Sequence, residues 1–366
     1  MDTLTHALSG AVLGRVLARP GRTGTLQLRA AQAVAAGAAA AAFPDIDFVL
    51  GYVSEIAYLR GHRGVTHSVL LAPLWALLLA GLMSRISRLG GGDARPWRAF
   101  YPVALGALLI HIAGDFITQF GTMMLAPFSD RRFGLGTTFI IDLVFSGILL
   151  GGLLASAIWR RSRVPAALAL VAVAGWVGVG WMGRGEALEA GRAYAAAQGI
   201  PIVTLDAAPR PASPFNWTVV VFDGRDYHLA HLNTRRSEPM LAGPDDNFIR
   251  RYSAPYQPVA QAVWERRARF GNGEAEALAR SVWEAEDFAF YRWFALFPVL
   301  DRVDAADPGG MRCAAFRDLR FEMPGRTELP FRYGLCGALA GGPWRLYKVV
   351  GEGRSWLDLG GARAAE

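Results

Sequence analysis

The feature that most constrains this chain is a histidine and an aspartate placed four residues apart inside the apolar stretch 99–121. His111 and Asp115 are the only histidine, acidic or basic side chains in that stretch. A helix places residues i and i+4 on one face, one turn apart, so one cation could be held by both. Ionisable groups inside membrane-type segments are costly and indicate function by default. The alternative is a neutral histidine hydrogen-bonded to Asp115 that joins two helices.

Several apolar runs predict that the first half of the chain is embedded in a membrane. Hydrophobic residues make up 52% of the 366-residue sequence. The apolar runs are 2–18, 30–43, 68–83, 99–121, 138–159 and 164–182. The longer ones reach the roughly 20 residues that a spanning helix needs. We therefore expect an all-α polytopic membrane bundle of about five to six helices over residues 1–182, followed by a soluble α+β domain over residues 183–366.

The net positive charge belongs entirely to the apolar half. Residues 1–182 contain 15 arginines, no lysine and 8 acidic residues, which leaves +7, and the remainder is neutral. The segments 15–29, 84–98 and 159–163 hold 11 arginines and one acidic residue, Asp93. Short arginine-rich loops face the cytoplasm in membrane proteins, so we expect these three segments there. This distribution argues against nucleic-acid binding, which a basic chain otherwise suggests.

The same charge rule places the candidate site on the opposite side of the membrane. The segments 44–66 and 121–137 fall on that side, with the N-terminal end and everything after residue 182. We therefore expect a multi-pass protein of a bacterial-type inner membrane, with the site and the C-terminal domain outside the cytoplasm.

The second half of the chain is predicted to form a small α+β domain. Two runs, 215–222 and 227–232, flank the turn Asp223–Asp226 and predict a hairpin. Helices are expected within 186–198 and 261–293, and strands at 319–322, 329–333 and 344–350. Cys313 and Cys336 allow one disulfide in an oxidising compartment but do not require it.

Further histidine and aspartate residues of the first half lie near the face that carries His111 and Asp115. The candidate metal ligands are His6, Asp45, Asp47, His62, His67, His111 and Asp115. Imidazole and carboxylate ligands without cysteine suit zinc, and also manganese or iron. Such an ion lowers the pKa of bound water toward about 7, which suits hydrolysis. A set of this size allows two ions, and Asp45 or Asp115 could bridge them and assist catalysis.

Four further residues have two interpretations each. Asp142 could be a ligand, or it could accept a hydrogen bond that fixes a histidine tautomer. Arg63, Arg131 and Arg132 could hold a phosphate or a lipid headgroup through bidentate hydrogen bonds. They could equally form salt bridges or lie at the membrane interface.

Five elements of the first half, in this order, resemble a known family. They are Met-Asp-Thr-Leu-Thr-His-Ala at the start, Pro44-Asp45-Ile46-Asp47, His62-Arg63-Gly64-Val65-Thr66-His67-Ser68, His111-Ile-Ala-Gly-Asp115, and Pro127-Phe128-Ser129-Asp130-Arg131-Arg132. Together they resemble the YdjM-like family of inner-membrane, metal-dependent hydrolases, over roughly residues 1–160. The resemblance implies a membrane hydrolase with a bound metal and does not identify its substrate.

A second resemblance concerns the helix with the spaced pair. His111-x-x-Gly-Asp115 is similar to the His-x-x-Gly-Asp helix of zinc-dependent phospholipase C and the related single-strand zinc nucleases, which cleave phosphodiesters with three zinc ions. In those enzymes an early histidine, an aspartate and another histidine precede that helix, as His6, Asp45 and His62 or His67 do here. Their second helix, with a His-x-x-x-Glu pair, has no counterpart after Asp115. The resemblance therefore implies one or two zinc ions.

The expected function is metal-dependent hydrolysis, of a phosphoester in a lipid or a lipid-linked substrate. The partners we expect are the lipid bilayer and that substrate, and the sequence does not indicate a protein partner. One alternative is a membrane carrier in which the same ligands form a transit site. The other is a structural or partner-binding membrane protein whose metal site joins helices.

Overall fold

The computed structural model describes residues 1–18, 26–89, 94–304, 310–326, 328–338 and 343–357. It divides into two units. The first contains Met1–Leu50, Gly61–Gly185 and Pro209–Asn216, and the second contains Gly51–Arg60, Glu186–Ala208 and Trp217–Glu366. Each unit is described by itself.

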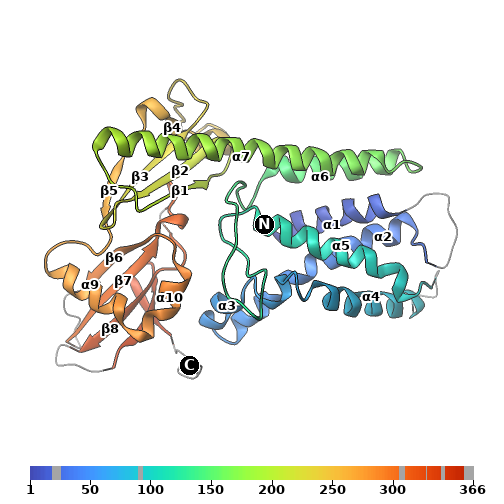
Figure 1. The fold of residues 1–366 in the computed structure, drawn as a ribbon, viewed down its shortest axis with the longest axis horizontal. Coiled ribbons are helices and arrows are strands. Elements are labelled where there is room, and N and C mark those ends of the chain that lie inside the picture. Colours follow the sequence, from blue (N-terminus) through green and yellow to red (C-terminus); the bar gives the residue numbers. More distant parts are fainter. Residues whose placement is uncertain (19–25, 90–93, 305–309, 327, 339–342, 358–366) are drawn as a thin grey trace. The chain divides into compact units, whose positions relative to one another are not determined.

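The first half of the chain is helical, as expected. Its helices are α1 (Thr3–Leu17), α2 (Ala30–Ala42), α3 (Glu55–Gly61), α4 (Ala72–Leu89), α5 (Trp97–Phe116), α6 (Leu143–Ile158) and α7 (Val164–Gln198), with 3-10 turns at Phe43–Tyr52 and Val65–His67. In the first unit, α1 packs against α2, α5 and α6, and α5 packs against α2 and α4 (Figure 1).

The described helices include fewer clear membrane spans than the sequence predicts. Three segments are long and apolar enough to cross a membrane: Ala30–Tyr52, Trp97–Phe116 and Val164–Gln198. A fourth is possible if Glu55–His67 and Ala72–Leu89, which meet at a bend of 79°, form one span. The expected number of five to six is therefore not confirmed. The α-helix that begins at Ala30 ends at Ala42, and a 3-10 helix continues from Phe43 through Pro44 to Tyr52.

The helix α7 joins the two halves of the chain without a break. It has 35 residues, so the expected helices 164–182 and 186–198 are one element. The expected domain boundary after residue 182 falls inside this helix, and the units divide a few residues later, between Gly185 and Glu186.

The core of the helical unit consists mainly of small side chains. Buried alanines line α2, α4 and α5, including Ala40, Ala76 and Ala107. Between α1 and α2 the backbones approach so closely that a Cβ added to Gly37 would lie 2.1 Å from the carbonyl oxygen of Gly10. Small residues permit such close helix packing in membranes, where the hydrophobic effect does not drive helices together. The alanine-rich sequence of α2 therefore allows it to pack closely against both α1 and α5.

The second unit contains the expected combination of sheets and short helices. One sheet has the strand order β1-β2-β3-β4 with β5 also paired to β3, and the other has the order β10-β9-β8-β7-β6. Their strands are β1 (Thr204–Pro209), β2 (Asn216–Phe222), β3 (Asp226–Asn233), β4 (Gln257–Pro258), β5 (Glu265–Ala268), β6 (Pro298–Asp304), β7 (Met311–Asp318), β8 (Tyr333–Ala338), β9 (Arg345–Val350) and β10 (Gly353–Trp356). The helices are α8 (Phe248–Ser253), α9 (Glu274–Glu284), which packs on the second sheet, and α10 (Ala289–Phe294).

Several local predictions for this unit are confirmed and three are wrong. The hairpin is confirmed as β2 and β3, and the strand at 344–350 as β9. Residues 265–268, expected in a helix, form β5 because they pair antiparallel with β3. Leu319–Phe321, expected in a strand, is a 3-10 turn capped by the Asp318 side chain. Of the strand expected at 329–333, only Tyr333 lies in a strand, because β8 begins there.

The two cysteines form a disulfide within the second sheet. Cys313 on β7 lies directly opposite Cys336 on β8 in the antiparallel register, and the two are bonded. The sequence allows this bond, and the register of β7 and β8 places the two cysteines close enough to form it.

The close contact of α1 and α2 gives a direct prediction. Gly37→Ala places a Cβ against the backbone of Gly10, so the helices must separate, and we expect the free energy of unfolding to fall by about 1–3 kcal/mol. The melting temperature of the detergent-solubilised protein measures this. Gly147→Ala is the matched control because nothing lies within 4 Å of a Cβ there. Equal melting temperatures for the two variants would contradict the close packing.

Candidate metal centre

The centre is built at the C-terminal end of α5, where it meets α1 and the segments that follow α2 and α3. His111 and Asp115 are fully buried on α5. His6 comes from the first turns of α1, and Asp45 comes from the 3-10 segment that follows α2. His67 ends the short turn before α4 and is also fully buried. Residues far apart in sequence therefore converge, as the sequence predicts.

Three of these side chains direct ligand-type atoms at one another. The Nε2 atoms of His67 and His111 are 3.0 Å apart, and Asp115 Oδ2 lies 3.2 Å from the first and 3.5 Å from the second. Donor atoms bound tetrahedrally at about 2.0–2.1 Å from one zinc ion lie about 3.3 Å apart. The observed spacings are of that size, so the three atoms are arranged as ligands of one ion would be.

Two more residues complete the set. Asp45 Oδ1 lies 3.7 Å from His111 Nε2 and 3.9 Å from His67 Nε2. His6, Asp45, His111 and Asp115 each offer one ligand atom, and these atoms all lie within 4.8 Å of one another. The imidazole of His6 stacks on that of His111, with ring centroids 3.7 Å apart. Nitrogen and oxygen donors together, without sulfur, suit zinc, manganese or iron.

The hydrogen bonds behind the two central histidines determine which ring nitrogen faces the centre. His111 Nδ1 lies 2.5 Å from the carbonyl oxygen of Ala41. A carbonyl only accepts, so Nδ1 carries the proton and Nε2 presents its lone pair. His67 Nδ1 faces the hydroxyl of Thr66 at 3.0 Å and a carboxylate oxygen of Asp47 at 3.5 Å, and the carboxylate favours the same tautomer. Metal-bound histidines are usually held through their second nitrogen in this way.

This arrangement is unfavourable without a cation. With both Nδ1 atoms protonated, two imidazole lone pairs face each other, and Asp115 Oδ2 is a buried oxygen with no hydrogen-bond donor among the described residues. Buried polar atoms normally have partners, and a buried oxygen without one requires an explanation. A metal ion bound by all three atoms would satisfy each of them. The residues present therefore fit a bound metal.

The other oxygen of Asp115 already has donors. Asp115 Oδ1 forms an ion pair with Arg63 Nη2 at 2.9 Å, accepts from the amino group of Met1 and faces His6 Nε2 at 3.2 Å. Arg63 is itself buried and donates to Thr118 at 3.0 Å. Its charge compensates the buried carboxylate. Of the two roles considered for Arg63, phosphate binding or a salt bridge, the described contacts support the salt bridge.

Asp47 and His62 lie one layer outside the centre. Asp47 Oδ1 lies 2.9 Å from His62 Nδ1, and Asp47 Oδ2 accepts from the backbone amide of Arg63 at 2.8 Å. These contacts hold the segment that presents His67. Both residues were candidate ligands, and the structure places them as supports for the ligand segment.

Asp142 caps a helix and does not join the centre in the described part of the chain. Asp142 Oδ1 accepts from the amides of Val144 and Phe145, each at 2.9 Å, at the start of α6. Asp142 Oδ2 accepts from the indole of Trp176 at 2.8 Å. Both oxygens have partners there, so neither the ligand role nor the tautomer role considered for Asp142 is supported.

The two adjacent arginines differ in position. Arg132 donates to the carbonyl of His62 at 3.2 Å and lies over the ring of Phe120, as Arg63 does, so it borders the centre. Arg131 is exposed and lies over the ring of Phe133. Of the pair, Arg132 is the one whose described contacts connect it to the centre.

Besides the amino group of Met1, three supporting groups were not predicted. They are the hydroxyl of Thr3, which donates to Asp45 Oδ2 at 2.6 Å, the hydroxyl of Thr66 and the carbonyl of Ala41. Thr3 and Thr66 both lie inside the strings that carry the family resemblance, and that position was the available signal. The carbonyl of Ala41 has no sequence signal, because any residue supplies one.

Known proteins resemble this chain over part of its length. A protein of Bacillus subtilis (strain 168), described as uncharacterized protein YfhP, is 29% identical over 174 residues, covering 45% of this chain. The chain spans about half the length of that curated relative, 48%. No solved structure matches. The family model of the YdjM inner membrane proteins matches residues 1–187, which include the whole centre. The chain belongs to the YdjM inner membrane protein family.

Proposed function

We propose that this chain is a membrane-bound, metal-dependent hydrolase. The observation that carries the proposal is the convergence of the Nε2 atoms of His67 and His111 with Oδ2 of Asp115 in a buried site. A neutral histidine joining two helices needs only one donor and one acceptor. It does not account for the His67 and His111 Nε2 atoms facing each other.

Five residues would hold the ion, and the side chain of one of them is partly exposed at the surface of the unit. The set is His6, Asp45, His67, His111 and Asp115. When bound, zinc or a similar ion supplies a water of lowered pKa, a nucleophile suited to hydrolysis near neutral pH. The side chain of Asp45 is 18% exposed, whereas that of Asp115 is fully buried. Asp45, oriented by the hydroxyl of Thr3, is therefore the carboxylate best placed to accept a proton from an attacking water.

The surroundings of Asp45 favour a lipid or lipid-linked phosphoester as substrate. Exposed apolar side chains occur beside Asp45 and beside Thr3, its hydrogen-bond partner: Leu4, Ile46, Phe48 and Val49. Exposed apolar side chains of this kind suit acyl chains. Arg132, which donates to the carbonyl of His62, supplies a nearby positive charge for a phosphate. Soluble phosphodiesters would lack the apolar contacts.

The proposed side for the centre and the C-terminal unit is extracytoplasmic. The arginine-rich segments belong to the opposite ends of the helices. The disulfide supports the same side, since such bonds persist in oxidising compartments and are rare in the cytosol.

The first prediction concerns metal content. His111→Ala removes a ligand and the bond to Ala41, so we expect the purified full chain to retain about one tenth or less of the wild-type zinc or manganese. Elemental analysis of protein dialysed against metal-free buffer measures it. His231→Gln is the matched control, because His231 lies in the second unit against Thr218. Equal metal content in the wild type and His111→Ala would contradict the assigned centre.

The second prediction concerns catalysis. Wild-type protein loaded with zinc should hydrolyse a phosphodiester reporter, and Asp45→Asn should lower turnover by about 10²-fold or more, because the general base is lost. Turnover is expressed per bound metal, which separates loss of the base from loss of the ion. A phospholipid in mixed micelles is the second substrate. Undiminished turnover in both Asp45→Asn and His111→Ala would refute hydrolysis at this centre, and metal flux into proteoliposomes would instead indicate a carrier.

The third prediction concerns the side of the membrane. Cells quenched in acid and alkylated in denaturant should show Cys313 and Cys336 protected until a reductant is added, as expected outside the cytoplasm. In Cys336→Ser, Cys313 should be alkylated without reductant, which verifies the labelling. Alkylation of both cysteines in the wild type before reduction would place the second unit in a reducing compartment.

A further inference from the structure

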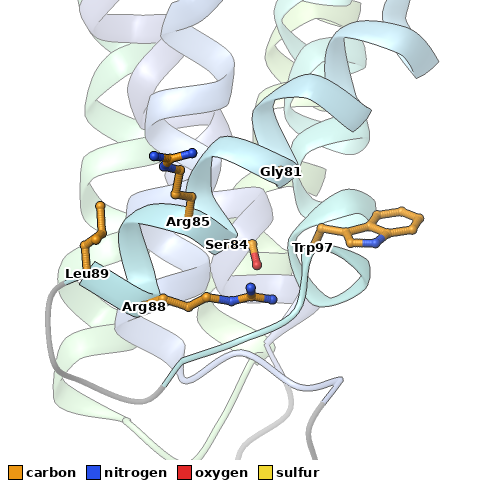
Figure 2. Close-up of a pocket in the computed structure, with 6 residues that line it drawn as sticks. All are labelled: Gly81, Ser84, Arg85, Arg88, Leu89 and Trp97. Atoms are coloured by element: carbon orange, nitrogen blue, oxygen red, sulfur yellow. The ribbon is translucent and has the colours of Figure 1, made fainter.

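A second candidate binding site lies at the opposite end of α5 from the metal centre. The cavity has a volume of about 430 Å³ and lies between the last turns of α4 and the first turn of α5. Figure 2 shows its lining residues, which are Gly81, Ser84, Arg85, Arg88, Leu89 and Trp97. The Arg88 side chain extends toward Ser84, one turn earlier on the same helix (Figure 2). Two cationic side chains therefore line a small cavity.

The positive charge of this cavity is not compensated by a carboxylate in the described part of the chain. Neither Arg85 nor Arg88 has a described ion pair, and both are exposed. Arg98 lies just beyond, with its guanidinium over the ring of Trp97. Asp93, the one acidic residue of segment 84–98, lies outside the described residues. The described groups around the cavity thus favour an anion.

The start of α5 adds to this preference. The N-cap residue of α5 is Pro96, whose side chain caps no amide. The helix has 20 residues, so its N-terminus carries a partial positive charge and amide groups available to an acceptor. The cavity at Trp97 therefore combines arginine side chains with a helix N-terminus.

An apolar surface leads along α4 to the cavity. The residues Leu74, Leu78, Leu82, Ile86 and Leu89 are all exposed and recur at intervals of three or four, so they form one stripe along the helix. The stripe ends at Leu89, which lines the cavity. Exposed leucines on a membrane helix face acyl chains, and Trp97 has the amphipathic ring typical of the interface. The site is therefore apolar along its length and cationic at its end.

The spacing along α5 places this cavity at one membrane surface. At 1.5 Å per residue, Trp97 and Asp115 are separated by about 27 Å along the helix, close to the roughly 30 Å thickness of the hydrocarbon core. If α5 spans the bilayer, the cavity and the metal centre lie at opposite surfaces. The arginine-rich segment 84–98 puts the cavity at the cytoplasmic surface, where anionic lipids attract basic residues.

We propose that this cavity binds the phosphate headgroup of an anionic phospholipid, with one acyl chain lying along the α4 stripe. Arg88, which extends toward Ser84 (Figure 2), contacts the phosphate, Arg85 adds positive charge at the edge of the cavity, and Trp97 marks the level of the headgroups. The site is separate from the metal centre, and the proposal does not depend on hydrolysis there.

The experiment uses the full chain in detergent, titrated with phosphatidylglycerol or phosphatidylcholine and analysed by native mass spectrometry. We expect the wild type to retain phosphatidylglycerol preferentially. The double variant Arg85→Gln, Arg88→Gln should bind it roughly 30-fold more weakly, because two basic side chains near the lipid surface are lost. Arg85→Lys, Arg88→Lys keeps the charge and should retain most of the preference.

The matched control is Arg160→Gln, Arg161→Gln, which removes the same charge from another arginine-rich loop. It should leave phosphatidylglycerol binding within about twofold of wild type, because a dispersed surface contribution is small. An equal loss in the control, or no loss in the Arg85, Arg88 double glutamine variant, would overturn the proposal. Displacement of the lipid by millimolar inorganic phosphate would also overturn it, since the site would then select free phosphate.

Discussion

The fully buried carboxylate of Asp115 is the constraint on which the helical unit depends. A buried charge is tolerated only if it is paired and hydrogen-bonded. One oxygen meets Arg63 and His6, and the other faces His67 and His111. These partners belong to three different segments, so compensating one charge draws α1, α5 and the segment between α3 and α4 together. The same compensation creates the set of ligand atoms.

Small side chains make that convergence possible. Because α2 is almost entirely alanine and glycine, its backbone lies close enough to α5 for the carbonyl of Ala41 to reach His111 Nδ1. The close approach of Gly10 and Gly37 likewise brings α1, which carries His6, against α2. The close packing of the unit and the tautomer of His111 therefore both depend on small residues.

Much of the centre could be predicted from sequence because its main signals are local. The four-residue spacing of His111 and Asp115 gives their shared face directly, and the family strings identify His6, Asp45 and His67. The roles of His62 and Asp47 could not be assigned, since the 3-10 backbone after Ala42 determines which carboxylate points inward. Asp142 was misleading because an aspartate before an apolar helix is equally a cap, and that is where the structure places it. In the second unit, β5 depends on pairing with a distant strand, which local pattern does not encode.

The proposed centre requires a metal ion held by imidazole and carboxylate groups around Asp115. X-ray absorption at the zinc edge of the zinc-loaded full chain tests it most directly. We expect nitrogen and oxygen ligands at about 2.0–2.1 Å with the scattering pattern of at least two imidazoles and no sulfur. A spectrum of hydrated zinc without imidazole, or one with a sulfur ligand, would contradict the central claim.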